Sequence, residues 1–250
     1  MTKGIMIASF GTSYEETRKL CIEAIEQDIA NEFADYYTHR AFTSRMIIKK
    51  LKNRDGLYID NEVEALVKMK EEGIENIFIQ PLHIIPGLEY EKITSLQGAK
   101  ISKPLLYDET DYDEVVNNLP LGISQDEALV FMGHGSEHNA DSAYERLENK
   151  YREAGIENVF IATVEGSRTL EDLIPELKSK GFNKVVLRAF MIVAGDHAQN
   201  DMASDEEDSW KTILASEGFD VEVRLVGLGE YQEIRNIFLR HLNETIGEQQ

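Results

Sequence analysis

Short apolar runs alternate with amphipathic segments along the whole chain, and this alternation predicts its secondary structure. Runs of about four to eight residues that are rich in Val, Ile and Phe are typical of buried β-strands. The pattern predicts eight strands, at residues 4–9, 35–42, 76–80, 101–107, 128–132, 158–162, 184–189 and 220–226.

Amphipathic helices are predicted between these strands. Four segments repeat their apolar residues with the period of one helix face, and three of them end in a glycine of the kind that terminates helices. They are residues 15–33, 62–73, 140–155 and 170–181. Strands that alternate with helices in this way predict an α/β fold with parallel sheets and right-handed crossovers.

The eight strands divide four and four around a turn at residues 117–126 that contains Pro and Gly. A chain of 250 residues is long enough for two lobes of ordinary domain size. We therefore expect two similar α/β lobes, each a four-stranded parallel sheet flanked by helices, with a cleft between them. The predicted lobes are residues 1–122 and 123–250. The long amphipathic helix at residues 230–245 either stays with the second lobe or crosses back to the first.

The two halves also repeat in sequence. Residues 73–90 align without gaps on residues 181–198, and two glycines of the first segment fall on two glycines of the second. Two residues after the second glycine, one copy has Glu89 and the other has His197. Such a duplication predicts an equivalent position for these two ionisable residues in the two lobes.

A third ionisable residue, His134, stands in "MGHGS", whose counterpart "FGTS" in the first half begins with Phe10. Glycines on both sides of His134 leave its ring unshielded, so we interpret it as a functional residue. His134, His197, Glu89 and Phe10 all follow predicted strands, and ligands of parallel sheets bind at the carboxyl ends of the strands. Two lobes that face each other would bring two histidines and a carboxylate to one cleft, an arrangement suited to a metal.

The surroundings of these residues suggest further roles. Asp196, next to His197, is a candidate to hold the imidazole through a hydrogen bond. Glu89 alone is ambiguous, because a glutamate at the start of a helix often only complements the helix dipole. His83 lies in an apolar context, where a packed histidine is the default interpretation. Nitrogen and carboxylate ligands without a thiolate suit a first-row divalent ion, and the lack of cysteine ligands argues against structural zinc.

Charge excludes several classes of partner. With 46 acidic and 26 basic residues the formal net charge is -20, which argues against nucleic acid as a partner. No apolar run approaches the ~20 residues of a membrane-spanning helix. The N-terminus lacks the pattern of a signal peptide, so we expect a cytoplasmic protein. Although the chain as a whole is acidic, residues 44–54 form a basic run, which is either a solvated helix face or a binding site for an anionic ligand.

Five short motifs together resemble one known family. They are "FGTS", "AFTSRMI", "QPLHIIPGLEYEK", "MGHGS" and "AGDHAQNDM", in the same order and at comparable spacing over nearly the whole chain. The family is that of the anaerobic sirohydrochlorin cobaltochelatases of the cobalamin pathway, class II relatives of ferrochelatase. The resemblance implies a two-lobed enzyme that inserts Co²⁺ into the tetrapyrrole sirohydrochlorin without ATP and without an organic cofactor.

The resemblance also implies roles for individual residues. The metal-binding residues of the family correspond to Glu89, His134 and His197, with His134 and Glu89 as the catalytic pair that handles protons. For the tetrapyrrole, whose carboxylates need local cations, we expect Arg45 to bind a carboxylate and Phe10 to contact the macrocycle.

Three alternatives stay open at this point. The metal is Co²⁺ by resemblance, but histidine and carboxylate also accept Fe²⁺ or Ni²⁺, so a ferrochelatase-type reaction on sirohydrochlorin or a porphyrin is the nearest rival. A non-catalytic carrier of a tetrapyrrole or metal would use the same residues without needing a base. A duplicated protein that binds another small anion is the third. The oligomeric state is not readable, although an exposed apolar face on the C-terminal helix would favour a homo-oligomer.

Overall fold

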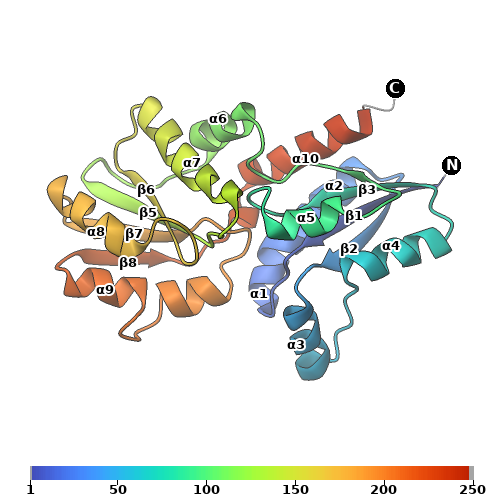
Figure 1. Cartoon of the computed structure of the whole chain (residues 1–250), viewed down its shortest axis with the longest axis horizontal. Helices are drawn as coiled ribbons and strands as arrows, with labels where there is room; N and C mark the ends of the chain where they lie inside the picture. Colours follow the sequence, from blue (N-terminus) through green and yellow to red (C-terminus); the bar gives the residue numbers. More distant parts are fainter. Residues whose placement is uncertain (1, 248–250) are drawn as a thin grey trace. The chain divides into compact units, whose positions relative to one another are not determined.

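The computed structural model describes residues 2–247, and the chain divides into two compact units. The first consists of Met1–Asp111 together with Gly229–Gln250, and the second is Tyr112–Leu228. Each unit has one four-stranded parallel sheet with helices packed on it, as Figure 1 shows for each unit separately. The predicted α/β fold class is confirmed.

Strand β1 is central in the sheet of the first unit, whose order is β2-β1-β3-β4. The strands are β1 (Lys3–Ser9), β2 (Tyr37–Phe42), β3 (Asn76–Pro81) and β4 (Lys100–Ile101). The prediction of a strand over residues 101–107 was wrong in its length, because β4 has only two residues. Pro104 lacks an N–H and cannot extend the hydrogen-bonded ladder, so the chain leaves the sheet early.

Helices cover both faces of this sheet. They are α1 (Glu15–Thr17), α2 (Ala24–Glu32), α3 (Arg45–Asp55), α4 (Glu62–Glu71), α5 (Leu88–Thr94) and α10 (Gln232–Gly247), with a π-helical segment at Arg18–Glu23 between α1 and α2. The C-terminal helix α10 packs beside α2 and β3 (Figure 1). Its apolar residues, including Ile234, Phe238 and Leu242, are buried there. The apolar face that would have favoured a homo-oligomer is therefore used inside the first unit.

The sheet of the second unit has the order β6-β5-β7-β8, the same arrangement as in the first unit. Its strands are β5 (Glu127–Gly133), β6 (Val159–Thr163), β7 (Lys184–Ala189) and β8 (Asp220–Arg224). The helices of this unit are α7 (Ser142–Glu153), α8 (Leu170–Ser179) and α9 (Trp210–Ser216), together with most of α6 (Glu109–Asn118), whose first turn belongs to the first unit. Equal strand order in both units agrees with the internal duplication that the sequence predicts.

Alternating side chains of the central strand β5 are buried on the two faces of the second sheet, where helices pack. Val130 and Met132 are fully buried in a cluster with residues of α8 and α9, such as Leu173 and Leu214. Residues at the intervening positions, such as Phe131, are equally buried on the opposite face. Each large apolar side chain that is buried in this way contributes about 1.5–3 kcal/mol. The strand ends that carry the candidate site are therefore fixed by the core.

The boundary between the two units differs from the predicted boundary between the lobes. The first unit ends at Asp111 rather than at residue 122. Residues after Asp111 already contact the second unit, since Lys150 of α7 pairs with Asp113 and Arg188 of β7 donates to the carbonyl oxygen of Pro120. The C-terminal helix α10 belongs to the first unit, which the sequence had left open.

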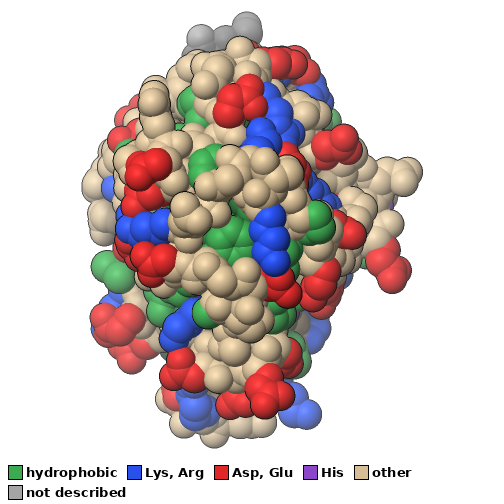
Figure 2. Space-filling model, turned by 90° about the vertical axis from the view of Figure 1, so that its left-hand side faces the viewer, with side chains coloured by type: hydrophobic (Ala, Val, Ile, Leu, Met, Phe, Trp, Pro, Cys, Tyr) green, Lys and Arg blue, Asp and Glu red, His purple; other side chains and the backbone are tan. Residues whose placement is uncertain are grey.

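Acidic and basic side chains are interspersed on the surface. Figure 2 shows this mixture, with apolar atoms between the charged groups, on the face that it presents. Many of the cations are paired, for example Lys180 with Glu157 and Lys184 with Glu127. None of the described helices is long and apolar enough to cross a membrane.

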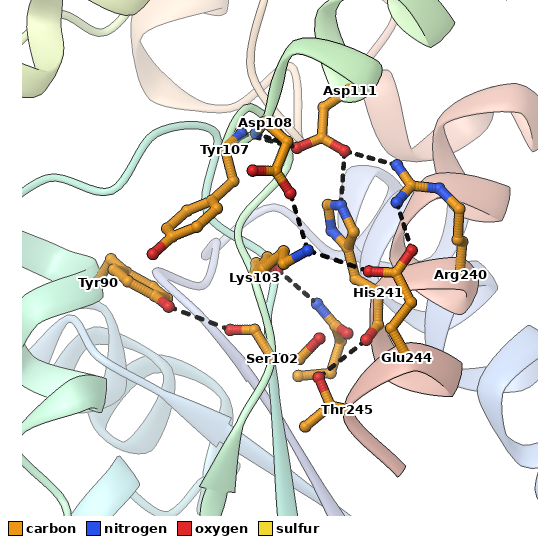
Figure 3. Close-up of polar contacts among 11 residues, drawn as sticks. Tyr90, Ser102, Lys103, Tyr107, Asp108, Asp111, Arg240, His241, Glu244 and Thr245 are labelled. Carbon is orange, nitrogen blue, oxygen red and sulfur yellow. Dashed lines mark hydrogen bonds and ion pairs between the residues drawn. The ribbon is translucent and has the colours of Figure 1, made fainter. Parts of the chain in front are cut away.

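A buried carboxylate, Asp111, holds α10 to the rest of the first unit (Figure 3). One of its oxygens accepts hydrogen bonds from Arg240, at 2.5 Å, and from His241, at 2.7 Å. The other accepts from the backbone N–H groups of Tyr107 and Asp108. Burial alone would raise the pKa of Asp111, but the hydrogen bonds and positive charges around it outweigh burial and lower its pKa far below the usual range. The carboxylate therefore stabilises the fold above the pKa that an aspartate has in an unfolded chain, and this contribution is lost as the pH falls below it.

Replacing Asp111 by Asn should destabilise the first unit by about 3 kcal/mol at pH 7, because a neutral amide cannot accept from four donors at once. Urea denaturation at pH 7 measures this loss. The matched control is Asp108→Asn, which removes a half-exposed carboxylate paired with Lys103 in the same network and should cost about 1 kcal/mol or less. Equal losses in the two variants would contradict the central place of Asp111.

Candidate functional site

His134 is the first residue after β5. Its Nδ1–H donates to the carbonyl oxygen of Gly135 at 3.0 Å, because a carbonyl oxygen can only accept. This hydrogen bond fixes the tautomer and leaves Nε2 with a free lone pair. The side chain is 41% exposed, so the lone pair is open to a ligand.

His197 lies after β7, directly before a π-helical turn at Ala198–Met202. Its Nδ1 is 2.5 Å from a carboxylate oxygen of Asp201, four residues later. The carboxylate that holds this nitrogen is thus Asp201 rather than Asp196, the predicted partner. One helical turn puts residues four apart on the same face, whereas adjacent residues point in different directions. Again Nδ1 is occupied and Nε2 is left for a ligand.

The structure brings the two histidines together in the second unit. Their ring centroids are 4.8 Å apart and the ring planes are nearly perpendicular, at 89°. Glu165, from the segment after β6, joins them, with a carboxylate oxygen 3.9 Å from Nδ1 of His134. One ligand atom from each of the three residues lies within 4.8 Å of the others. Two atoms bound to one metal at about 2.1 Å are at most about 4.2 Å apart, so small side-chain rotations would be enough for these three residues to share one cation.

Adjacent parallel strands explain why these residues meet. Strand β5 lies between β6 and β7, so three carboxyl ends are next to one another. The backbone continues this pairing beyond the strands, since the N–H of Glu165 donates to the carbonyl oxygen of His134 at 2.8 Å. Glu165 carries no signal in the sequence that marks it as a ligand, because no motif surrounds it and it lies about 30 residues from either histidine along the chain.

Glu89, Phe10 and Arg45 lie in the first unit, at the equivalent edge of its sheet. Glu89 is in the first turn of α5, whose N-cap is Gly87, and one of its carboxylate oxygens accepts from Lys92 at 2.5 Å. The other oxygen is buried and has no hydrogen-bond partner among the described residues. Phe10 directly follows β1 and is 42% exposed, which is unusual for an aromatic residue beside a sheet.

Arg45 is the first residue of α3, and its guanidinium is already paired. It donates two hydrogen bonds to the carboxylate of Glu62, at 2.5 and 2.6 Å, and one to the carbonyl oxygen of Thr43. Glu62 is buried, which alone would raise the pKa of its carboxyl, but the hydrogen bonds and charge of Arg45, together with a backbone hydrogen bond and the charge of Lys92, outweigh burial and lower the pKa. The side chain of Arg45 stays 53% exposed, so part of the guanidinium can also meet a ligand.

His83 is buried, as expected for a packed histidine. Neither ring nitrogen has a hydrogen-bond partner among the described residues. Burial lowers the pKa of His83 to about 4, against a small opposing effect of the charge of Glu89. His83 is therefore uncharged at neutral pH and is a poor proton acceptor there.

Comparison with known proteins gives matches over nearly the whole chain. The family described as Cobalt chelatase (CbiK) matches residues 3–247. The chain is 39% identical to the sirohydrochlorin cobaltochelatase of Salmonella typhimurium, over 98% of this chain and 97% of that protein. It is 33% identical to the sirohydrochlorin cobaltochelatase CbiKC of Nitratidesulfovibrio vulgaris, over 98% of this chain and 90% of that protein.

Solved structures with the same fold are more distant in sequence. SirB from Bacillus subtilis with Fe³⁺ has a TM-score of 0.65 at 14% identity and covers 100% of this chain and 98% of its own. The multi-domain protein DR2241 from Deinococcus radiodurans, described as structurally similar to chelatases, has a TM-score of 0.59 at 12% identity. It covers 98% of this chain, which spans 55% of DR2241. At these identities the likeness concerns the fold.

The buried neutral imidazole of His83 should make the first unit acid-sensitive. Because its folded-state pKa of about 4 lies below the value of about 6.5 in an unfolded chain, stability is lost as the pH falls from about 6.5 towards 4. Between pH 7 and pH 4.5 the native protein should lose about 2 kcal/mol more than a His83→Gln variant. Urea denaturation of both proteins at the two pH values measures the difference. Equal losses of stability in the two proteins would contradict the prediction, because protonation of His83 would then not destabilise the fold.

Proposed function

We propose that this protein, which belongs to the cobalt chelatase family, inserts Co²⁺ into sirohydrochlorin without ATP in the anaerobic route to cobalamin. The observation that carries the proposal is the group of His134, His197 and Glu165, which offers two imidazoles and a carboxylate to one cation. Imidazole and carboxylate suit first-row divalent ions, and the absence of thiolate ligands from this group favours release over permanent binding.

The reaction exchanges one divalent cation for two protons. Co²⁺ forms bonds to the pyrrole nitrogens, and the two pyrrole N–H bonds break. In both histidines Nδ1 is occupied by a hydrogen bond, so Nε2 can hold either the metal or a proton. A histidine that gives up the metal thereby becomes free to accept a proton. Transfer of the cation to the macrocycle and removal of its protons are coupled in this way.

Glu89 is proposed as the catalytic carboxylate of the first unit. Its sequence counterpart in the second unit is His197, and its second oxygen is buried without a partner among the described residues. An oxygen in that situation gains free energy from a cation or a proton. We propose that Glu89 contributes to metal binding and takes up a proton, while Glu165 neutralises the charge of the metal beside the histidines.

Substrate binding is proposed for Phe10 and Arg45. The exposed ring of Phe10 offers an apolar surface for the macrocycle. Arg45, at the start of a basic helix, offers a cation to a substrate carboxylate while its pairing with Glu62 holds the guanidinium in place. The pairing also means that Arg45 brings less net charge than the sequence suggested.

Two rivals lead to different outcomes. Fe²⁺ or Ni²⁺ could replace Co²⁺ on the same ligands, and relative rates with the three ions decide between them. A carrier would bind the tetrapyrrole and the metal without accelerating their reaction.

Anaerobic metallation of sirohydrochlorin by Co²⁺, followed by visible absorbance, tests the proposal. We expect native protein to accelerate the reaction, and His134→Ala and Glu165→Gln to lose about 10²-fold or more, the usual contribution of a metal-binding or proton-transferring group. His39→Gln, which changes a histidine of β2 outside the site, is the control and should keep native activity. Binding of the tetrapyrrole without acceleration by native protein would identify a carrier.

The role of Arg45 is tested in a double variant, Arg45→Gln with Glu62→Gln, which avoids leaving a buried carboxylate unpaired. Loss of a charged hydrogen bond to the substrate should raise the KM for sirohydrochlorin about tenfold and change kcat little. Lys68→Gln, which removes an exposed cation elsewhere in the first unit, is the control. An unchanged KM in the double variant would mean that Arg45 does not contact the substrate.

A further inference from the structure

Asp141 is a buried carboxylate close to the metal-binding candidates. It is 7% exposed and is the last residue of a short 3-10 helix, Asn139–Asp141, that leads into α7. It occupies the N-cap position of α7, yet its side chain makes no capping hydrogen bond to that helix. Aspartate at this position usually accepts from the first amides of the helix. Here the carboxylate is used elsewhere.

The two oxygens of Asp141 bind two different loops. Oδ1 accepts from the backbone N–H of Ser136 at 3.0 Å, and Oδ2 accepts from the backbone N–H of Ser167 at 2.8 Å. Ser136 is two residues after His134, and Ser167 is two residues after Glu165. The carboxylate thus ties the loop that carries one proposed metal ligand to the loop that carries another.

The sequence of the two loops repeats this arrangement. One reads His134-Gly135-Ser136 and the other Glu165-Gly166-Ser167, so each is a ligand, a glycine and a serine whose N–H meets Asp141. Both hydrogen bonds are donated by backbone amides, so they depend on the position of the main chain and not on the serine side chains.

Both glycines are needed for the loops to approach. Gly135 has a φ of +80°, and a Cβ there would lie 2.3 Å from the backbone nitrogen of Gly166. A Cβ on Gly166 would lie 2.4 Å from Oδ1 of Asp141. The backbones of the two loops are therefore in close contact, and the carboxylate packs against them with no room for a side chain at either glycine.

We propose that Asp141 is a positioning residue for the metal: by accepting from both loop amides it fixes the distance between His134 and Glu165. The proposal rests on the proposed function, because it takes these two residues as metal ligands. Hydrogen bonds that orient ligands are commonly worth 10–100-fold in metal affinity. Asp141 neither touches the metal nor moves a proton in this scheme.

The test is Co²⁺ binding to the protein alone, without tetrapyrrole, followed by the visible absorption of the bound ion. In Asp141→Asn one of the two accepting oxygens becomes an NH₂ group that faces a backbone N–H. We expect a changed Co²⁺ spectrum and affinity lower by about 10–100-fold. In steady-state metallation the KM for Co²⁺ should rise while the KM for sirohydrochlorin stays unchanged.

Asp111→Asn is the matched control. Asp111 is also a buried carboxylate that accepts from two backbone N–H groups, those of Tyr107 and Asp108, but it belongs to the first unit and makes no hydrogen bond to either ligand–glycine–serine loop. This variant should lose stability and keep the native Co²⁺ spectrum. A second variant, Gly166→Ala, displaces the Asp141 carboxylate without removing it and should weaken Co²⁺ binding in the same way as Asp141→Asn.

Two outcomes would overturn the positioning role. One is a native spectrum and affinity in Asp141→Asn, and the other is an equal change in Asp111→Asn, which would trace the effect to a general loss of stability. Failure of the ligand assignment itself is separate, because it shows in His134→Ala and His197→Ala. If both variants kept the native Co²⁺ spectrum, the metal would bind elsewhere whatever Asp141 does.

Discussion

Hydrogen bonding between parallel strands is the constraint on which the rest of the structure depends. Strand β5 pairs with β6 on one side and β7 on the other, so three strand ends lie about 4.8 Å apart at one edge of the sheet. His134 and Glu165 lie one and two residues after the ends of β5 and β6, and His197 lies in the segment that follows β7. A shift of one residue in either pairing would move a ligand by about 3.3 Å, more than a metal–ligand bond length. The buried core that fixes the register therefore also fixes the site.

The same constraint acts in the first unit with different chemistry at the edge. Its strand order matches that of the second unit, so Phe10, Arg45 and Glu89 follow β1, β2 and β3 much as the metal-binding candidates follow their own strands. The second unit presents imidazoles, whereas the first presents an aromatic ring, a paired guanidinium and a carboxylate. The two copies thus share a scaffold but carry different side chains at its edge. This agrees with the proposed roles, which are metal ligands in the second unit and substrate contacts together with the carboxylate of Glu89 in the first.

Much of this could be predicted from the sequence, for identifiable reasons. The apolar runs of β5 and β7 are buried on both faces, which makes such strands easy to recognise. His134 and His197 were found because glycines and the internal repeat mark them. Glu165 was missed because a single glutamate in a loop has no periodic signal, and only its pairing with His134 across neighbouring strands gives it meaning.

Pairings of charged side chains were the least predictable feature, since they depend on residues distant in the chain. Arg45 belongs to a basic run, yet Glu62 from the next helix occupies much of its guanidinium. The residues next to Arg45 in the chain do not reveal this pairing, so the sequence alone predicts an unpaired cation. An arginine that is paired with a glutamate holds a fixed orientation, but the pair has no net charge. Its recognition of a substrate carboxylate therefore depends more on the direction of its hydrogen bonds than on long-range attraction.

A chelatase must hold its metal and then give it up, and the exposure of the ligands bears on both requirements. His134, His197 and Glu165 have side chains that are 41%, 31% and 61% exposed, so the proposed metal ligands are open to solvent. A closed site with cysteine ligands would hold the cation too firmly to pass it on. Exposed side chains, however, must be held in place by their neighbours if they are to reach one cation together. Asp201 accepts a hydrogen bond from the ring of His197, and Asp141 accepts from the backbone of two loops, so in the proposed scheme both restrain the ligands without adding a bond to the metal.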